Sequence, residues 1–410
     1  MRYGLLGRKL GHSYSPQIHK YLGNYYYELL EREPEDLKVF FENKEFDGIN
    51  VTIPYKKDTV PYCDRLSDTA KKLGSVNTIV RSSDGSLTGH NTDYFGFLSM
   101  VRHSGLDVKN KKVLVLGSGG ASVTVMAVLE KLDANTVQIS RTGANNYSNL
   151  YLHKDASVIV NATPVGMYPD TGKSPLDLAD FPDLEGVLDL IYNPAQTKLL
   201  LDAEKRGLKW ENGLWMLVAQ AKESAEWFSG TTIPDELISN IYDNLSKQMK
   251  NIVLVGMPGC GKSTIGKLIA EMAGRTFADA DIAISEAAQM SIPEIFIAKG
   301  ESGFREIETE VLSNLGKRSG CVIATGGGCV TRPENYDLLH QNSTIIWIKR
   351  PIDQLPTDGR PLSQTNGLQA MYQAREPLYK AFADHIVNNH ESIEDAAEQI
   401  LGLFRKDSWK

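Results

Sequence analysis

Cysteine is scarce in this chain of 410 residues. Its four cysteines, Cys63, Cys260, Cys321 and Cys329, form no CxxC pair and no framework of closely spaced pairs. A secreted disulfide-rich fold and a cysteine-based metal site both need such pairs. The sequence therefore predicts reduced thiols and a cytosolic compartment, and it argues against a metal site built on cysteine.

Long apolar runs and an excess of positive charge are also missing. No stretch approaches the roughly 18 continuous apolar residues of a membrane-spanning helix, and the amino-terminal MRYGLLGRKLGHS has no apolar core of the signal-peptide kind. The formal net charge is -7, which gives no basic field for nucleic acid or an anionic membrane. We therefore expect a cytoplasmic protein without a membrane or nucleic-acid partner, in which any anionic ligand is bound locally.

Two series of short apolar runs, rich in β-branched residues, indicate two α/β domains with parallel sheets. The runs are VLVLG (113–117), TVQIS (136–140) and SVIVNA (157–162), then NIVLVG (251–256), CVIATGGG (321–328) and TIIWI (344–348). Two or three domains also suit the length, because single cores rarely exceed roughly 250–300 residues. The polar DNLSKQMKN (243–251) places the boundary near residue 248.

The first glycine-rich loop is GSGGAS (117–122), between the first of these strands and the apolar VTVMAVLEKL. This strand, turn and helix order is the one a dinucleotide pyrophosphate needs, with Gly117, Gly119 and Gly120 letting the backbone approach the phosphates. A tight turn without a ligand would give the same pattern, so the loop alone leaves both interpretations open.

The end of the next strand reads Ser140-Arg141-Thr142. An NAD-binding domain usually carries Asp or Glu there for the ribose hydroxyl. A cation instead suits the 2'-phosphate of NADP, although a solvated surface arginine is the alternative for Arg141.

Small polar residues, one lysine and one aspartate cluster earlier in the chain, in GHSYSP (11–16), NVTIPYK (50–56), SVNT (75–78) and GHNTD (89–93). Each cluster alone could be turn chemistry, because these side chains bond neighbouring backbone groups. Together with GSGGAS, SRT, NATPVGM (161–167), DLIYNP (189–194) and GLWMLVAQA (213–221), they make residues 1 to 245 resemble shikimate dehydrogenase.

That resemblance implies a substrate domain, residues 1–100 completed by 214–245, around a Rossmann NADP-binding domain, residues 101–213. It implies Lys56 and Asp93 as the catalytic pair and Gly213 near the nicotinamide. The residues implied to bind shikimate are Ser13, Ser15, Thr52, Asn77, Tyr192 and Gln220. Those implied to contact NADP(H) are Gly117, Ser118, Gly119, Gly120, Ala121, Ser140, Arg141 and Thr142.

The chemistry of ketone reduction suits the implied pair, since hydride transfer leaves an alkoxide that needs a proton or a cation. A lysine titrates at about 10.4 in water, and a neighbouring carboxylate raises that value. We therefore expect Lys56 to act as a stabilising cation and proton donor, with Asp93 orienting it. The chain departs from the family in GANNYSN after Arg141, where a second basic residue is missing, and before SVIVNA, where the segment is too short for a full helix.

The second glycine-rich loop is GMPGCGKS, which fits GxxxxGKS from Gly256 to Ser263 and lies between a predicted strand and the predicted helix GKSTIGKLIAEMAG. Backbone N–H groups of such a loop wrap phosphates, Lys262 would reach the β and γ groups of ATP, and Ser263 would ligate Mg²⁺. The residues assigned to this site are Gly256, Gly259, Cys260, Gly261, Lys262, Ser263 and Thr264, with Cys260 as a small filler.

The motifs after this loop are FADAD (277–281), GESGFREIE (300–308), TGGG (325–328), GRPL (359–362) and REPLY (375–379). With them, residues 250 to 405 resemble shikimate kinase, inside a P-loop domain of the nucleoside-monophosphate-kinase kind at 246–410. The resemblance implies Asp279 on the magnesium side, Asp281 as base or orienting group, Arg305 and Arg375 on the shikimate carboxylate, and Gly326 and Gly327 in the substrate cradle. Arg360 is implied as the cation of a short lid, and surface ion pairs or solvated loops are the alternatives for the arginines.

The two resemblances describe consecutive reactions, because the alcohol made by the first half is the alcohol phosphorylated by the second. We expect a bifunctional enzyme that uses NADP(H), ATP and Mg²⁺ on small-molecule substrates. Quinate or another hydroxy acid as the dehydrogenase substrate, and a sensor without catalysis, remain the alternatives. The sequence does not predict the oligomeric state.

Overall fold

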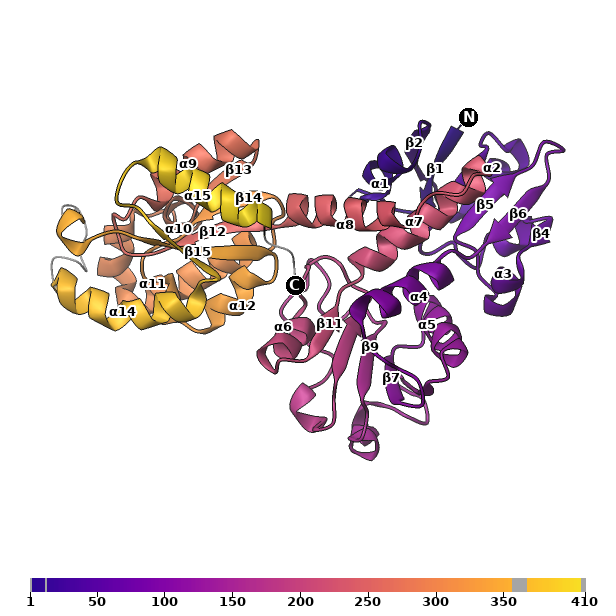
Figure 1. Cartoon of the computed structure of the whole chain (residues 1–410), viewed down its shortest axis with the longest axis horizontal. Coiled ribbons are helices and arrows are strands. Elements are labelled where there is room, and N and C mark those ends of the chain that lie inside the picture. Colours follow the sequence, from indigo (N-terminus) through magenta and orange to yellow (C-terminus); the bar gives the residue numbers. More distant parts are fainter. Residues whose placement is uncertain (1, 12, 356–366, 407–410) are drawn as a thin grey trace. The chain divides into compact units, whose positions relative to one another are not determined.

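A computed structural model describes residues 2–11, 13–355 and 367–406 (Figure 1). The chain divides into two compact units, which we describe separately. The first unit is Met1–Val165, Ser174–Tyr192 and Asp202–Asp243, and the second is Gly166–Lys173, Asn193–Leu201 and Asn244–Lys410.

The first unit begins with a mixed sheet of six strands in the order β2-β1-β3-β5-β6-β4. The strands are β1 (Arg2–Gly7), β2 (Tyr26–Glu31), β3 (Gly48–Val51), β4 (Arg65–Leu66), β5 (Thr78–Arg81) and β6 (Leu87–His90). Its helices are α1 (Ser15–Leu22), α2 (Leu37–Asn43) and α3 (Asp68–Leu73). The strands β3, β5 and β6 pair antiparallel, so that the chain segments at their ends lie close together.

The second sheet of this unit is parallel, with the order β11-β10-β9-β7-β8. Its strands are β7 (Lys112–Leu116), β8 (Asn135–Ile139), β9 (Val158–Asn161), β10 (Gly186–Asp189) and β11 (Lys209–Glu211). The helices α4 (Asp93–Ser104) and α5 (Gly120–Lys131) accompany them, and α6 (Lys198–Lys205) crosses the division between the two units. The helix α7 (Leu214–Ser229) contacts α4, and it also contacts α1 and β5 of the first sheet. The parallel Rossmann-type strands predicted from three apolar runs are confirmed, and the segment before β9 forms only the 3-10 helix η3 (Tyr147–His153).

The second unit holds the third sheet, again parallel, in the order β13-β14-β12-β15-β16. Its strands are β12 (Asn251–Val255), β13 (Thr276–Asp279), β14 (Cys321–Ala324), β15 (Ser343–Lys349) and β16 (His385–Asn388). Its helices are α9 (Lys262–Ala273), α10 (Ala280–Ala288), α11 (Ile292–Gly316), α12 (Glu334–His340), α14 (Leu368–Phe382) and α15 (Ile393–Lys406). Figure 1 shows α9 and α15 on one side of this sheet and α11, α12 and α14 on the other, which explains why β12 and β14 are buried on both faces.

The polar segment 243–251, which places the predicted boundary near residue 248, covers the last residues of helix α8 (Glu236–Met249) and the start of β12. The two units divide between Asp243 and Asn244. Ile238, Ile241, Tyr242, Leu245 and Met249 are buried, and their spacing of three or four residues puts them on one helical face. Asp243, Asn244 and Gln248 are exposed, whereas Ser246, Lys250 and Asn251 are buried. The polar composition of the segment therefore does not report its exposure.

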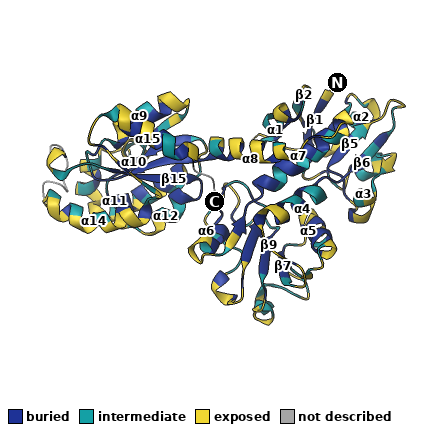
Figure 2. Ribbon diagram, in the orientation of Figure 1, coloured by how far each residue is buried: buried dark blue, intermediate teal, exposed yellow. Residues whose placement is uncertain are grey.

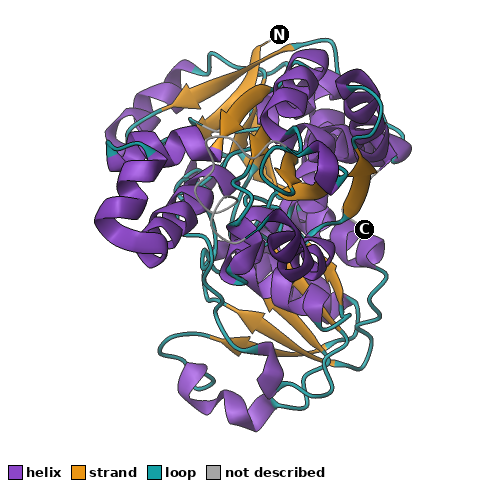
Figure 3. Cartoon of the chain, turned by 90° about the vertical axis from the view of Figure 1, so that its left-hand side faces the viewer, coloured by secondary structure: helices purple, strands orange, loops and turns teal. Residues whose placement is uncertain are grey.

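Burial follows the expected pattern in both units. Figure 2 shows central strands such as β7, β9 and β15 in the dark blue of buried residues and the outer faces of the helices in yellow. Edge strands such as β2 and β8 are only partly buried. Figure 3 shows helices beside each group of strands. None of the helices in the described ranges combines the length and apolar character that crossing a membrane requires.

Candidate active sites

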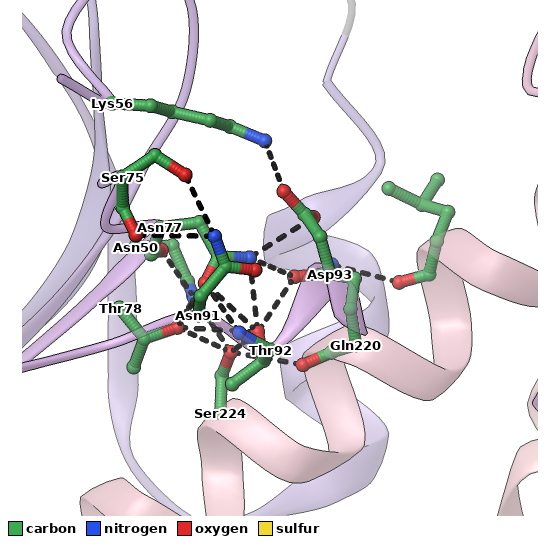
Figure 4. Close-up of polar contacts among 11 residues, drawn as sticks. Asn50, Lys56, Ser75, Asn77, Thr78, Asn91, Thr92, Asp93, Gln220 and Ser224 are labelled. Carbon is green, nitrogen blue, oxygen red and sulfur yellow. Dashed lines mark hydrogen bonds and ion pairs between the residues drawn. The ribbon is translucent and has the colours of Figure 1, made fainter. Parts of the chain in front are cut away.

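The first candidate site centres on an ion pair between Lys56 and Asp93. Lys56 lies in the turn after β3, and Asp93 is the first residue of α4. The Lys56 Nζ lies 2.6 Å from Asp93 Oδ2, with the lysine side chain 31% and the aspartate side chain 15% exposed (Figure 4). The pair is thus partly withdrawn from water yet open to a ligand.

Asn77 holds the other oxygen of this carboxylate. Its Nδ2 donates to Asp93 Oδ1 at 3.0 Å, and its Oδ1 accepts from the Thr92 backbone N–H at 2.7 Å. The backbone carbonyl of Lys56 accepts from Val76 N–H, directly before Asn77. The antiparallel strands therefore bring Lys56, Asn77 and Asp93 together from three separate motifs.

Helix α7 closes this site with Gln220 and, one turn later, Ser224. The Asn77 Nδ2 lies 3.5 Å from Gln220 Oε1. The Ser224 hydroxyl lies 2.8 Å from Thr78 Oγ1 and accepts a 2.8 Å bond from Asn50 Nδ2 (Figure 4). A buried polar network in which each member has partners fixes a single geometry, so this network positions the ion pair.

The remaining residues predicted to bind the substrate lie in the same unit. The Ser15 backbone N–H donates to Ser13 Oγ at 3.2 Å at the start of α1, and Thr52 follows β3. The Tyr14 and Tyr192 rings lie edge to face, with 6.2 Å between their ring centres. Burial raises the pKa of the Tyr192 hydroxyl above its ordinary value.

The first glycine loop joins β7 to α5, as predicted. Gly117 has a φ of 113°, which favours glycine. A Cβ at Gly119 or Gly120 would meet no atom within 4 Å, and neither residue has a positive φ. The chain's own packing therefore does not require these two glycines, and the α5 amino terminus lies open to a phosphate group.

Of two other residues predicted to contact the cofactor, Arg141 is exposed and Gly213 is closely packed. Arg141 lies just after β8 and is exposed. A Cβ at Gly213 would lie 2.0 Å from the Leu190 carbonyl oxygen, so packing between α7 and the end of β10 by itself demands this glycine.

The second candidate site is a cavity of about 870 Å³ at the carboxyl ends of the third sheet. The P-loop between β12 and α9 forms its centre, with positive φ angles of 144° at Gly256, 82° at Gly259 and 105° at Gly261. Lys262 Nζ donates to the carbonyl oxygens of Gly256 and Met257 at 2.9 and 3.0 Å. The lysine thus lies folded along the loop that it is predicted to complete.

Ser263 and Asp279 meet beside this loop. The serine hydroxyl donates to Asp279 Oδ2 at 2.6 Å, so two oxygen groups suited to Mg²⁺ come from α9 and the end of β13. Asp281, two residues later, lines the cavity.

Two arginines lie on the wall of the same cavity. Arg305 is buried, and its Nη1 donates to Glu308 Oε2 at 2.5 Å. Arg375 Nη1 donates to the Gly327 carbonyl oxygen at 3.1 Å, and a Cβ at Gly327 would lie 2.6 Å from Pro258 Cδ. Both arginines and the TGGG turn are therefore brought together, whereas Arg360 lies outside the described residues.

Comparisons with known proteins assign a family to each half of the chain. The family model for the shikimate dehydrogenase substrate binding domain matches residues 5–79, and the shikimate kinase model matches residues 258–404. Shikimate dehydrogenase (NADP(+)) of Clostridium beijerinckii is 33% identical over 269 residues, covering 60% of this chain and 99% of the relative.

The chain belongs to the shikimate dehydrogenase family. Its carboxyl-terminal part is a shikimate kinase domain, so the protein is a bifunctional fusion.

Solved structures agree with the dehydrogenase half. Shikimate dehydrogenase 1 from Peptoclostridium difficile has 36% identity and a TM-score of 0.55, covering 60% of this chain and 97% of that structure. Shikimate 5-dehydrogenase from Thermus thermophilus, solved in complex with NADP(H) and shikimate, has 30% identity and a TM-score of 0.55, covering 60% and 99%.

Sequence reasoning missed the supporting residues of the shikimate dehydrogenase half. They are Asn50, Thr78, Asn91, Thr92 and Ser224. Four of them lay inside motifs quoted above, and the spacing of Ser224 four residues after Gln220 was the one signal for it. In the kinase domain Glu308 was also missed, although Arg305 and Glu308 are three residues apart on α11. Burial raises the pKa of the Glu308 carboxyl, while Arg305 opposes that shift.

Proposed function

We propose that the chain reduces 3-dehydroshikimate to shikimate with NADPH and then phosphorylates the 3-hydroxyl of shikimate with ATP. The observation that carries this proposal is the presence of two complete sets of chemical groups: the Lys56–Asp93 pair, and the P-loop with Lys262 and the Ser263–Asp279 pair. A sensor without catalysis would not need both sets.

In the reduction, NADPH supplies the hydride and the developing alkoxide lies against Lys56. Its ammonium group offsets the negative charge and donates the proton, which moves from Nζ to the substrate oxygen. Asp93 orients the ammonium group, and Asn77 and Gln220 offer amide groups to substrate hydroxyls. Ser13, Ser15, Thr52 and Tyr192 would hold the rest of the ring and its carboxylate.

The cofactor preference rests on Arg141 at the end of β8. A guanidinium there suits the 2'-phosphate of NADPH, and no acidic residue follows β8 to hold the ribose hydroxyl of NAD. The loop residues Gly117, Ser118, Gly119, Gly120 and Ala121 would contact the pyrophosphate, with Ser140 and Thr142 beside the adenosine ribose and Gly213 beside the nicotinamide.

In the phosphorylation, ATP supplies the transferred group and Mg²⁺ offsets its charge. The P-loop N–H groups of Gly259, Gly261 and their neighbours would hold the phosphates. Lys262, which donates to loop carbonyl oxygens in this structure, would instead donate to the β and γ oxygens. Asp281 orients the attacking hydroxyl and accepts its proton. Arg305 and Arg375 hold the carboxylate of shikimate, which Gly326 and Gly327 allow to approach.

A coupled assay tests the proposal. The purified chain is given 3-dehydroshikimate, NADPH, ATP and Mg²⁺, and the products are separated by mass. We expect NADPH consumption, followed by a phosphorylated shikimate that requires both nucleotides. NADP-dependent oxidation of quinate at a rate above that of shikimate would overturn the substrate assignment, and the absence of both turnovers would favour a sensor.

We also place the protein in the cytoplasm, with small molecules rather than nucleic acid or membranes as its partners. The net charge of -7 gives no basic field for nucleic acid or an anionic membrane, and four free cysteines suit a reducing compartment.

A further inference from the structure

The kinase cavity has two sides, separated by the P-loop strand β12 at the centre of the sheet. On one side, Asp281 and Gly326 follow β13 and β14. On the other side, Arg350 and Asn389 follow β15 and β16, and both line the cavity. Because Asp281 and the arginines of the acceptor site lie on the first side, the second side faces the part of the nucleotide remote from the transferred group.

The guanidinium group of Arg350 has no carboxylate partner among the residues that the structure describes. Its Nε is buried without a hydrogen-bond partner, and no ion pair joins it to another described residue. The neighbouring Lys349 differs, because its Nζ lies 3.0 Å from Glu376 Oε1 and 5.2 Å from the Trp347 ring centre. Of these two adjacent cations, only Arg350 lines the cavity with donors available for a ligand.

The backbone around Arg350 is tied to the P-loop. A Cβ at Gly256 would lie 2.5 Å from the Ile348 carbonyl oxygen, so the end of β15 packs directly on the loop. Asn389 also links the end of β15 to the P-loop. Its backbone N–H donates to the Lys349 carbonyl oxygen at 2.8 Å, and its Nδ2 donates to the Cys260 carbonyl oxygen at 2.9 Å. Arg350 therefore starts from a backbone fixed beside the phosphate loop.

We propose that Arg350 binds the α- and β-phosphates of the nucleotide in the kinase site, a role that rests on the kinase activity proposed above. A guanidinium presents a planar fork of N–H donors that matches two phosphate oxygens. Arg350 lines the cavity on the side away from the acceptor site, so its guanidinium group contacts the α- and β-phosphates rather than the γ-phosphate. ATP and ADP therefore gain equally from this contact.

The test compares Arg350→Met, Arg350→Lys and the control Lys349→Met in the full chain. Calorimetric titration with ADP, adenosine and shikimate separates phosphate binding from contacts to the base and from the acceptor site. We expect Arg350→Met to weaken ADP binding about 10-fold to 100-fold and to leave adenosine and shikimate binding unchanged. Arg350→Lys should bind ADP more tightly than Arg350→Met, and Lys349→Met should match the parent chain.

Kinetics give a second measurement. The KM for ATP should rise in Arg350→Met by the same factor as the ADP dissociation constant, while kcat at saturating ATP changes less than about 3-fold. Unchanged ADP affinity would overturn the role of Arg350, and an equal loss for adenosine would replace phosphate binding by a contact to the base. Phosphorylation of shikimate by the parent chain tests the proposed function independently, because the Arg350 result depends only on nucleotide binding.

Discussion

At the scale of single residues, the sequence identified chemical groups more readily than the groups that support them. Lys56, Asn77 and Asp93 each stand in a recognisable motif, and hydrogen bonds join them. Asn50 and Ser224 are 174 residues apart, yet their side chains lie 2.8 Å from each other. Such a contact depends on how α7 returns to the first sheet, and no local pattern encodes it.

Arg141 is the residue on which the choice of cofactor depends. Arg141→Ala removes a charge-assisted bond worth about 1.5 to 3 kcal/mol, so NADPH affinity should fall roughly 10-fold to 150-fold while NADH affinity stays constant. Steady-state reduction with each cofactor measures the effect. Equal efficiency of NADH and NADPH in the parent chain would contradict the assignment.

Glu223 on α7 gives the dehydrogenase half a pH-dependent stability. Burial raises the pKa of its carboxyl from 4.5 to about 8, Glu226 and Asp93 add to that shift, and Lys222 opposes it. The folded chain then keeps a proton that the unfolded chain has released, so the free energy of unfolding falls as the pH rises from about 4.5 to about 8. Below that window this penalty is absent.

Glu223→Gln should therefore stabilise the folded chain at pH 8.5, by about 1 to 3 kcal/mol, and have little effect at pH 5. Residual dehydrogenase activity after heating at each pH, assayed at one common pH, reports the change. Glu35→Gln replaces an exposed glutamate of the same unit and should show no such difference. A gain at pH 5 as large as that at pH 8.5 would rule out titration as the cause.

At the scale of elements, hydrophobic periodicity and glycine placement predicted strands and helices well where a sequence pattern is compatible with only one kind of structure. The strands that precede the two glycine loops, β7 and β12, pair parallel with β8 and β15, as predicted. The polar composition of residues 243–251 could not distinguish an amphipathic helix from a linker, and only the buried face of α8 separates the two structures. The glycines present the same ambiguity, since packing explains Gly213 but not Gly119.

That contrast yields a prediction for the loop between β7 and α5. Gly119→Ala adds a methyl group that meets no atom of the chain, at a φ of -83° that alanine readily adopts. Thermal stability of the dehydrogenase half should stay unchanged, while the KM for NADPH rises at least about 10-fold, because a Cβ blocks the approach of the pyrophosphate. Gly402→Ala, at an equally open position of α15, is the control and should change neither quantity. An unaltered KM for NADPH in Gly119→Ala would show that the loop is only a turn.

At the scale of the whole molecule, the chain holds two sets of reactive groups in two units, and no described residue of one set belongs to the other. Lys56 and Asp93 lie in the first unit, and Lys262 and Asp281 lie in the second. The sequence could predict this duplication because each half of the chain has its own glycine loop and its own set of motifs. It could not predict that short segments such as Asn193–Leu201 group with the second unit, because that depends on tertiary contacts.

Separate sets of groups predict separate activities. Lys56→Ala removes the cation that offsets the alkoxide, so reduction should fall by at least about 100-fold while shikimate phosphorylation stays within about 2-fold of the parent. Asp281→Asn removes the group that orients the attacking hydroxyl and should produce the reverse pattern.

Each variant is assayed for both reactions, with shikimate supplied directly in the kinase assay. Loss of the first product then cannot imitate loss of the second activity. Because each substitution changes one partly or fully exposed side chain, the untouched activity also reports that the chain has folded. If either variant lost both activities while its melting profile matched that of the parent, the two reactions would have to share groups, and two independent sites could no longer describe the enzyme.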